Sequence, residues 1–572
     1  MRSPLRARSG RRQPDVERSR HGAPSANTTP ARPTRPIHPH GHVPRPSSCA
    51  IAIPTKPTVD TPTPARSTTQ RANVDAPDRD GKIIGNMFAG DRPPGGRWPW
   101  VRSPWFGSAI VVVLALTARA PGYFRQLFDP DEGAIATMGM VVARGGELYR
   151  DVIDRKPPIS AFVYAGSFLL TGNRDLRPLH LVAALTLGAS AVVLAYGARR
   201  VAGPTAGWWA AGLLIAGAIA MRPVDAQAAN FGHLALLPAC GAIVAARSGS
   251  RRSALLAGVL LGVATLTRQT WVIGVVPAAY AAWWWGGRRL GRALLVIAGT
   301  VTTVAAIAIV VPFGPFWHWT FGANGSVLSL TESETVLARG SIAIDLFLVA
   351  HIAMCWLCVR RGWRRDDLDL WLWLGTGLVA FIAGFRFFGH YWLQVLPPLC
   401  FLAGLGIAAC RPSVRRMLVV AVAVPALAAW VLAFSPGRID PRIRALATYV
   451  RTHTRPTDRV TVWGSAAELY WLSGRDPGGA LITTDFVVGK TAGRADGPQR
   501  LRDATPGARA TFLRSLRAHP PKLFLDTSTA KLRTYDHYPL DRIPSVAAFV
   551  RKHYRRVATV RGVTVYELRS GS

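Results

Sequence analysis

Two short charged motifs lie among long apolar stretches of this 572-residue chain. The first is FDPDEG, residues 128–133, and the second is DRKPP, residues 154–158. They place carboxylates and a lysine in a part of the sequence where burying a charge is costly. A carboxylate can accept a proton from a hydroxyl group, and a lysine can hold an anion. The two motifs could therefore start a helix, form a reactive site, or do both.

FDPDEG is first of all a signal for the start of a helix. Asp129 suits the N-cap, Pro130 suits the first helical position, and Glu132 stands where a capping box requires it. Acidic residues in a first turn also suit the helix dipole. We therefore predict a helix over 130–144. Asp129 and Pro130 are explained by capping, which leaves Asp131 available for chemistry.

The composition divides the chain into three parts. Residues 1–95 are rich in Arg, Pro, Ser and Thr and nearly lack large apolar side chains, which predicts a disordered basic tail. Residues 96–437 are dominated by apolar runs of membrane-span length. Residues 438–572 have the mixed composition of a soluble α/β domain.

The formal net charge is +37, from 69 Lys and Arg against 32 Asp and Glu. No nucleic-acid recognition motif accompanies this charge, so we do not expect a nucleic-acid partner. Much of the excess lies in the tail and in short loops between apolar runs, which suits an anionic membrane surface. The six cysteines show no paired metal-ligand spacing, and five of them lie in or beside apolar runs. We expect them to act as small buried hydrophobic residues.

Basic turns between the apolar runs predict the membrane topology. They lie at 198–200, 247–252, 288–292, 360–365 and 411–416. When all of them are cytoplasmic, FDPDEG and the C-terminal domain fall outside and about eleven helices cross. The segment 158–171 then has both flanks outside and is short for a span, so we predict that it lies along the outer interface. Twelve crossings would put basic loops on the wrong side.

The predicted fold is therefore a polytopic α-helical membrane protein with an extracytoplasmic α/β domain. This topology brings further charged residues to the outer face: Lys156, Arg177, Arg222, Asp225, Arg268, Arg386 and His390. Arg268 interrupts an apolar stretch and has two interpretations. It marks a site, because an arginine facing lipid in mid-span costs roughly 2.5–3.5 kcal/mol. Alternatively, it lies near the interface, where its side chain reaches water easily.

Acidic and basic residues at one membrane face suggest a reaction on an anionic lipid. A carboxylate would take the proton of an acceptor hydroxyl, and cations would hold a phosphate as the leaving group. This is the chemistry of sugar transfer from a polyprenyl phosphate. A transporter or flippase of such lipids is the alternative, but it would favour internal repeats and charges near the midplane. A non-catalytic assembly protein would tolerate loss of Asp131 and Lys156.

The order of these motifs resembles the family 39 glycosyltransferases, which belong to the C-type membrane glycosyltransferase superfold. The similar stretches are FDPDEGAIATMGMVVARGGELYRDVIDRKPPI, LRPLHLVAAL, LTRQTW and RFFGHYWLQVLPPL, within roughly 104–434. The C-terminal VTVWGSAAELYWLSGRDP is similar to the tail domain of bacterial members. Relatives include protein O-mannosyltransferases and the aminoarabinose transferases that modify lipid A. The family consists of metal-independent inverting enzymes, so the resemblance implies no metal and no other cofactor.

The resemblance also implies roles for individual residues. Asp131 is similar to the general base of the family, with Glu132 beside it. The residues that resemble the donor-phosphate site are Lys156, Arg177, Arg268, His390 and Tyr391. The chain departs from the family where many relatives carry a further Asp or Glu at the outer start of a middle span. Asn230 stands there, with Asp225 as the nearest carboxylate, which implies substrate positioning.

We therefore predict an inverting glycosyltransferase in the plasma membrane of a bacterium, with the N-terminus cytoplasmic. It would move a mannose- or arabinose-like sugar from a polyprenyl phosphate to an acceptor hydroxyl at the cell envelope. The acceptor is a glycan, a lipid or a protein. In the C-terminal domain, strands are predicted at RVTVWG and KLFLD, with a hairpin around Arg561-Gly562. No G-x-G-x-x-G follows VTVWG, so we expect a structural or acceptor-guiding domain rather than a nucleotide-binding one.

Overall fold

The structure is a computed structural model that describes residues 104–323, 333–383, 385–435, 439–490 and 504–570. All of these residues lie in one structural unit. The tail predicted over 1–95 lies outside the described residues.

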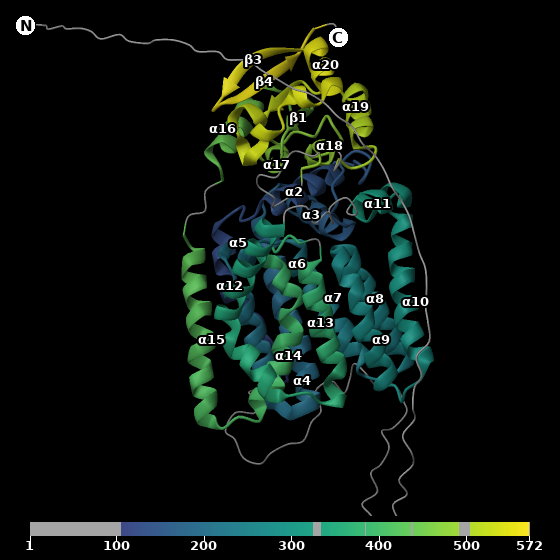
Figure 1. Cartoon of the computed structure of the whole chain (residues 1–572), viewed down its shortest axis with the longest axis vertical. Helices are drawn as coiled ribbons and strands as arrows, with labels where there is room; N and C mark the ends of the chain where they lie inside the picture. Colours follow the sequence, from purple (N-terminus) through teal and green to yellow (C-terminus); the bar gives the residue numbers. More distant parts are fainter. Residues whose placement is uncertain (1–103, 324–332, 384, 436–438, 491–503, 571–572) are drawn as a thin grey trace, which may run out of the picture. The chain divides into compact units, whose positions relative to one another are not determined.

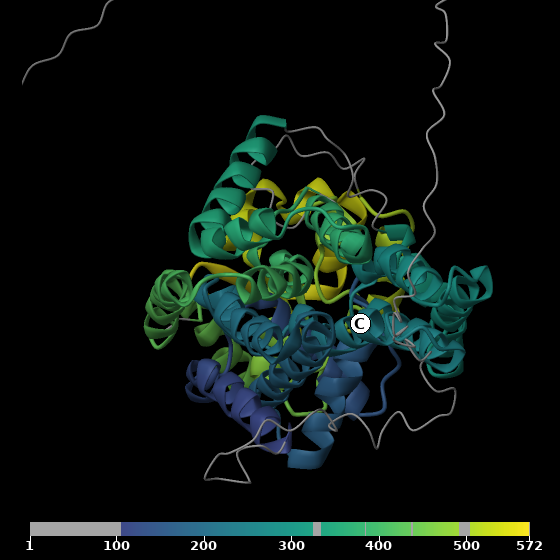
Figure 2. The ribbon, with the colours of Figure 1, turned by 90° about the horizontal axis from the view of Figure 1, so that it is seen from below.

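Long helices form a bundle (Figures 1 and 2), and the apolar runs that were predicted to cross the membrane lie on them. The helices are α1 (Pro104–Ala118), α4 (Arg177–Ile219), α7 (Leu236–Ala246), α8 (Arg251–Thr267), α9 (Val275–Trp284), α10 (Leu290–Ala306), α12 (Ser333–Arg361), α13 (Leu368–Ile382), α14 (Leu396–Ala408) and α15 (Pro412–Ala433). Among the described residues, four helices are long and apolar enough to cross a membrane, α4 and α15 among them. Side chains such as Val349 and Val420 are exposed on the bundle, which suits contact with lipid.

Helix α4 consists of two helices that fold back on each other. The backbone is not helical at Ala202 and at Gly203, whose φ is +81°, and Pro204 follows. A Cβ at Gly207 would lie 2.7 Å from the carbonyl oxygen of Ala195, so the two halves approach closely after the turn. The two apolar runs predicted over 178–198 and 206–221 thus become antiparallel neighbours joined by the basic turn.

Shorter helices lie at one end of the bundle, between it and the C-terminal part (Figure 1). They are α2 (Pro130–Ala143), α3 (Pro158–Thr171), α5 (Pro223–Gln227), α6 (Phe231–Leu234) and α11 (Phe313–Thr320). The segment predicted at the interface, 158–171, is therefore α3. It packs against α2, where a Cβ at Gly139 would lie 2.6 Å from Cβ of Tyr164.

Helix α2 begins as its sequence predicts. Asp129 is the N-cap and accepts a hydrogen bond from the backbone N–H of Asp131, at 3.0 Å. The Glu132 side chain reaches back to the N–H of Asp129, at 3.3 Å, which completes a capping box. Pro130 occupies the first helical position, where its missing N–H costs nothing.

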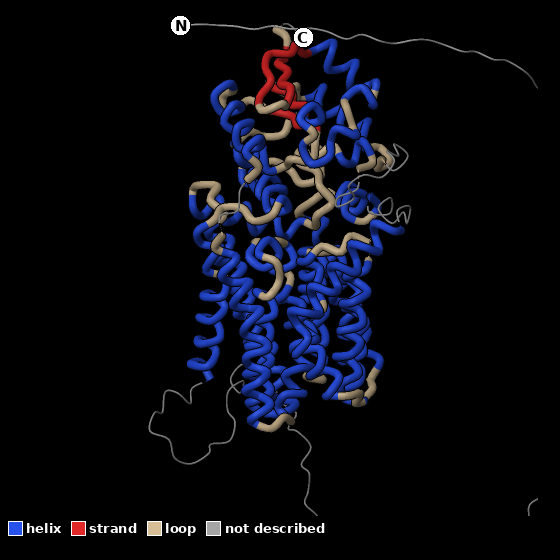
Figure 3. Tube along the Cα trace, turned by 60° about the vertical axis from the view of Figure 1, so that its left-hand side comes forward, coloured by secondary structure: helices blue, strands red, loops and turns tan. Residues whose placement is uncertain are grey.

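The C-terminal part is a small α/β unit around a four-stranded sheet in the order β1-β2-β4-β3, drawn red in Figure 3. Its strands are β1 (Val460–Trp463), β2 (Leu523–Asp526), β3 (Tyr554–Val560) and β4 (Val563–Leu568), and its helices are α16 (Pro441–His453), α17 (Glu468–Ser473), α18 (Asp485–Val488), α19 (Ala508–Ala518) and α20 (Pro544–His553). β1 and β2 are parallel, and the other pairs are antiparallel. The predicted hairpin turns at Arg561 and Gly562, both with positive φ, as in a type I′ turn.

The C-terminal unit is docked directly onto α2. Gly133 faces Glu468 of α17, where an added Cβ would lie 2.2 Å from Cβ of Glu468. One turn later, the Thr137 hydroxyl donates a hydrogen bond of 2.7 Å to the carbonyl of Ala467. The helix that carries Asp131 is therefore held by the C-terminal unit as well as by the bundle.

We predict that Gly133→Ala loosens this contact, because the new methyl group overlaps the backbone and Cβ of Glu468. Overpacking of this kind costs roughly 1–3 kcal/mol. The measurement is the thermal unfolding midpoint of the purified protein in detergent. Gly166→Ala is the matched control, because Gly166 is also helical but nothing lies within 4 Å of a Cβ there. Equal midpoints for the two variants would contradict the docking.

Candidate active site

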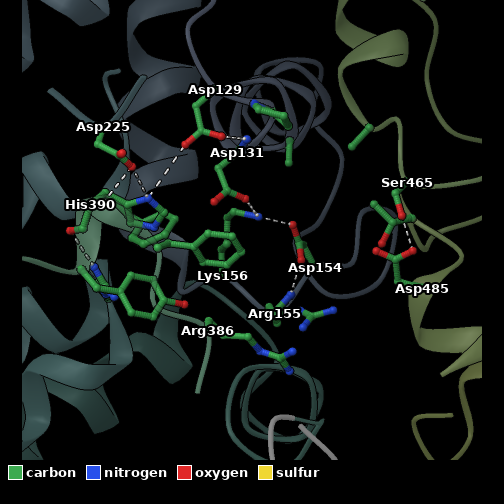
Figure 4. Close-up of a pocket in the computed structure, with 18 of the residues that line it drawn as sticks. Asp129, Asp131, Asp154, Arg155, Lys156, Asp225, Arg386, His390, Ser465 and Asp485 are labelled. Atoms are coloured by element: carbon green, nitrogen blue, oxygen red, sulfur yellow. Dashed lines mark hydrogen bonds and ion pairs between the residues drawn. The ribbon is translucent and has the colours of Figure 1, made fainter. Parts of the chain in front are cut away.

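A cavity of about 870 Å³ opens at the junction of the bundle end and the C-terminal unit. The start of α2, the loop before α3, the turn after α8 and the segment before α14 line one side, and the C-terminal unit lines the other. The lining residues predicted from the sequence are Asp129, Pro130, Asp131, Lys156, Asp225, Arg268, His390 and Tyr391. Figure 4 shows how several of these side chains point toward one another.

Lys156 lies between two carboxylates at the centre of this side. Its Nζ is 3.1 Å from Oδ1 of Asp131 and 2.7 Å from Oδ2 of Asp154. The lysine and Asp154 are nearly buried, at 12% and 6% exposure of their side chains, whereas Asp131 is 34% exposed. Of the two carboxylates, Asp131 is thus the one that a substrate can reach.

The same contacts determine the ionisation of Asp131 and Lys156. Burial alone raises the pKa of Asp131, but Lys156, together with His390 and Arg155, outweighs it and holds that pKa below the ordinary value. Burial alone lowers the pKa of Lys156, but Asp131 and Asp154 outweigh it and raise that pKa well above its ordinary value. Both groups are therefore charged at neutral pH. Asp131 is an ionised carboxylate paired with Lys156, and Lys156 is a fixed cation.

The loop that carries Lys156 is fixed by the C-terminal unit. The backbone N–H of Ile153 donates to the carbonyl of Ala480 at 2.7 Å, and the N–H of Ile482 donates back to Ile153 at 3.4 Å. Tyr149 donates its hydroxyl to the carbonyl of Lys156, at 2.9 Å. Two prolines follow the lysine and lead into α3. The lysine thus has a defined place although it lies in a loop.

Glu132 points away from the cavity and into the protein. It is fully buried and accepts hydrogen bonds from the N–H groups of Phe128 and Ala229, both at 2.6 Å. Its Oε1 also lies 2.8 Å from Nε2 of His180. Burial raises the pKa of Glu132, but His180 and the backbone donors outweigh it and lower the pKa below its ordinary value. In the structure, Glu132 anchors α2, while Asp131 lines the cavity.

The G-H-Y motif, residues 389–391, forms the neighbouring part of the cavity wall. The N–H of His390 donates to Oδ1 of Asp225 at 2.9 Å, and its Nδ1 lies 3.5 Å from the same oxygen. Asp225 also accepts from Arg222, at 2.9 Å. A Cβ at Gly389 would lie 2.1 Å from Oδ2 of Asp225, so only glycine fits there. Asp225 therefore holds the motif in place.

Arg268 faces the cavity rather than lipid. Its side chain is nearly buried, with the guanidinium 4.1 Å from the ring centre of Tyr391 and 5.3 Å from that of Phe231. It also donates to the carbonyl of His390, at 3.4 Å. These aromatic contacts hold the charge in a nearly buried position. Of the two interpretations of Arg268, the structure supports a position in the site.

Three of the lining residues could also hold a metal ion. One ligand atom each of Asp129, Asp131 and His390 lies within 4.8 Å of the others. Oxygen and imidazole ligands of this kind suit several divalent cations. The family resemblance implies a reaction without metal, and that expectation stays a prediction.

Three predicted site residues lie away from the cavity lining: Glu132, which was predicted beside Asp131 as catalytic, and Arg177 and Asn230. Arg177 starts α4 with its side chain 56% exposed, and its Nε donates to Asp175 at 2.7 Å. Asn230 is buried and caps α6, where it accepts from the N–H of Gly232 at 2.9 Å. The side chains of Arg177 and Asn230 thus each form a hydrogen bond with a residue two positions away in the sequence.

The structure adds lining residues that were not assigned from the sequence. The principal ones are Asp154, Arg155, Ser465, Glu468, Asp485 and Arg533. Asp154 was visible in the DRKPP motif, where it stands two residues before the lysine. Asp485 lies in the segment TTDFVVGKTAGRADGPQ, 483–499, which the sequence suggested as a loop facing the site. Ser465, Glu468 and Arg533 carried no local signal, because only the docking of the C-terminal unit brings them to the cavity.

We predict that Glu132→Ala destabilises the protein without touching the cavity directly. The change leaves His180 and two buried N–H groups without their acceptor, at a cost on the order of 2–4 kcal/mol. The thermal unfolding midpoint in detergent measures it. Glu147→Ala is the control, because Glu147 forms only an exposed ion pair with Arg150, worth at most about 1 kcal/mol. A midpoint equal to that of the control would rule out an anchoring role.

No family model and no curated protein matches the sequence. Among solved structures, the chain is similar to ArnT from Cupriavidus metallidurans bound to undecaprenyl phosphate, with 15% identity and a TM-score of 0.50, over 82% of this chain and 98% of that one. It is similar to the apo state of the same protein at 14% identity and a TM-score of 0.50, over 81% and 98%. The chain also shares 11% identity with the archaeal oligosaccharyltransferase AglB from Archaeoglobus fulgidus in complex with an inhibitory peptide and a dolichol-phosphate. That likeness covers 82% of this chain and 74% of that one, with a TM-score of 0.47.

The likeness to ArnT shows a shared fold. The chain has the C-type membrane glycosyltransferase fold that its motifs predicted, and this expectation is confirmed.

Proposed function

We propose that the protein is an integral-membrane glycosyltransferase that moves a sugar from a polyprenyl-phosphate donor to an acceptor hydroxyl. The single observation that carries the proposal is the Asp131–Lys156 ion pair at the cavity. It joins an ionised, reachable carboxylate to a fixed cation, which are the two groups that this transfer needs. The C-type fold and the sequence resemblance support the same activity.

In the proposed reaction, Lys156 and Arg268 hold the donor phosphate at the cavity wall. The acceptor oxygen forms a bond to the anomeric carbon as the bond from that carbon to the phosphate oxygen breaks. Asp131 takes the acceptor proton, and the polyprenyl phosphate leaves with the bonding electrons. Attack from the face opposite the phosphate inverts the anomeric configuration. Both cations stabilise the charge that grows on the leaving phosphate.

The ion pair also gives the donor a way to activate the base. Before the donor binds, Lys156 keeps Asp131 ionised but weakly basic. A phosphate at Lys156 draws the lysine charge away from Asp131, which raises the basicity of that carboxylate. Asp154 remains 2.7 Å from the lysine and keeps it in position. The base is thus strengthened when the substrate that needs it is present.

The proposal includes a membrane orientation. Helix α8 begins at the basic turn of Arg251 and ends beside Arg268 in the cavity, and α13 begins after the basic turn 360–365 and ends before Arg386. The basic turns and the cavity are therefore at opposite ends of the same helices. With the turns cytoplasmic, the cavity and residues 438–572 lie outside the cell, and the tail over 1–95 lies in the cytoplasm. The proposed membrane is the plasma membrane of a bacterium, which the chain crosses about eleven times. A mannose- or arabinose-like donor is part of the proposal.

The transfer is tested on purified protein in detergent with a panel of labelled polyprenyl-phosphate sugars. We predict that Asp131→Asn lowers release of polyprenyl phosphate about 10²-fold or more, because the amide cannot accept the proton. Asp366→Asn is the matched control, since Asp366 is exposed in the turn before α13. No release from any donor, or equal release by Asp131→Asn, contradicts the proposal. A chelator arm tests the expectation that no metal is needed.

The pH dependence tests the ion pair. With the pKa of Asp131 lowered by Lys156, the base stays ionised until the pH falls below the ordinary range near 4. Lys156→Met removes the attraction but keeps the burial, so we predict that the acidic limb of kcat/KM moves up by about one pH unit or more. Lys522→Met, a surface lysine paired with Glu567, leaves the limb in place. An unmoved limb in Lys156→Met would mean that another group is the base.

A further inference from the structure

We propose that the C-terminal side of the cavity binds the acceptor, and that this acceptor is an uncharged, polyhydroxylated glycan. The inference rests on the proposed function and names the substrate class of the same site. The surface in question, called the acceptor wall, consists of Ser465, Glu468, Thr483, Asp485, Lys490, Arg533 and Thr534.

The acceptor wall lies where an α/β sheet presents its ligand-binding edge. β1 and β2 run parallel, and Ser465 follows the carboxyl end of β1 by two residues. Asp485, at the start of α18, meets it there, because the Ser465 hydroxyl donates to the Asp485 carboxylate. Ligands of open α/β sheets bind outside the carboxyl ends of parallel strands. The acceptor wall therefore lies at the sheet edge where ligands are expected to bind, and its Ser465–Asp485 pair faces the cavity (Figure 4).

The two sides of the cavity differ in charge. The cations on the bundle side are Arg155, Lys156, Arg222, Arg268, Arg339 and Arg386, against the carboxylates Asp129, Asp131, Asp154 and Asp225. On the acceptor wall, two cations face two carboxylates. An anionic phosphate is therefore favoured on the bundle side, beside Lys156.

The cations of the acceptor wall are already engaged. Arg533 forms an ion pair with Glu468 and donates to the carbonyl of Ser465. Lys490 donates to the carbonyl of Arg533. A second phosphate, on a charged acceptor, would have to compete with these contacts. Neutral hydroxyl groups of an acceptor would not, because the Asp485 carboxylate can accept hydrogen bonds from them and the Thr483 hydroxyl can donate or accept one.

One residue connects the two sides of the cavity. The cavity of about 870 Å³ lies in the upper part of the range of roughly 300–1,000 Å³ that ligand pockets measure, and it is lined by both sides. Arg155 precedes Lys156 and places its guanidinium 4.8 Å from the ring centre of Phe486, next to Asp485. An acceptor on the wall thus lies across Arg155 from the ion pair that performs the transfer.

The test separates donor breakdown from transfer. With the best labelled donor, release of polyprenyl phosphate to water is measured without acceptor. Transfer is then measured to neutral manno-, arabino- and gluco-oligosaccharides, to lipid A, and to a serine- and threonine-rich peptide. We expect transfer to a neutral oligosaccharide. Transfer confined to lipid A or to the peptide overturns the inference but leaves the proposed function intact. No donor breakdown by the wild-type protein overturns both.

A variant then ties the acceptor to the wall. Asp485→Asn keeps the size of the side chain, and we expect it to raise the KM for the oligosaccharide about tenfold. Ser465→Ala, expected to raise the KM about threefold, is the second variant in case Asp485→Asn does not fold. Asp541→Asn, on an exposed side chain of the same unit, is the control. An unchanged KM in a folded wall variant overturns the inference.

Discussion

The candidate site depends on the burial of the first turn of α2. Three parts of the protein meet there: the Asp129 cap holds the helix start, His180 of α4 lies against Glu132, and Glu468 of α17 closes over Gly133. Nearby side chains accept hydrogen bonds from the free N–H groups at the start of the helix. The two carboxylates of the first turn point in different directions. One turn of helix thereby holds one carboxylate inside the protein and presents the next one to the cavity.

The electrostatics of the cavity follow from that placement. Lys156 lies between two carboxylates, and their attraction outweighs the burial that alone would lower the pKa of the lysine. In the proposed reaction, the donor phosphate would replace Asp131 as a partner of Lys156, while Asp154 would keep its contact with the lysine. On the opposite side, Arg533 and Glu468 compensate each other. The difference in charge between the two sides is what favours a charged ligand on one and a neutral ligand on the other.

Much of the site could be predicted from the sequence because its signals are local. The capping pattern of Asp129 and Glu132, the lysine before two prolines and the arginine in an apolar stretch are each visible within a few residues. Arg177 lies away from the cavity because a carboxylate two residues earlier takes its guanidinium. Ser465, Glu468 and Arg533 of the acceptor wall were not predictable, since their place depends on the docking of the C-terminal unit, which includes the pairing of Ile153 with a segment more than three hundred residues later. The fold class itself was predictable from the apolar runs and the basic turns.

The backbone pairing of Ile153 with Ala480 and Ile482 restricts how the proposed lipid donor could reach the cavity. If the C-terminal unit lifted away to admit a substrate, it would break this pairing, the Thr137 hydrogen bond and the contact at Gly133 at once. The loop of Lys156 would lose its anchor at the moment the phosphate needed it. An approach along the flank of the helices leaves all three contacts intact. In the proposed reaction, the C-terminal unit would therefore stay in place, and the donor would reach the cavity sideways, along the flank of the helices.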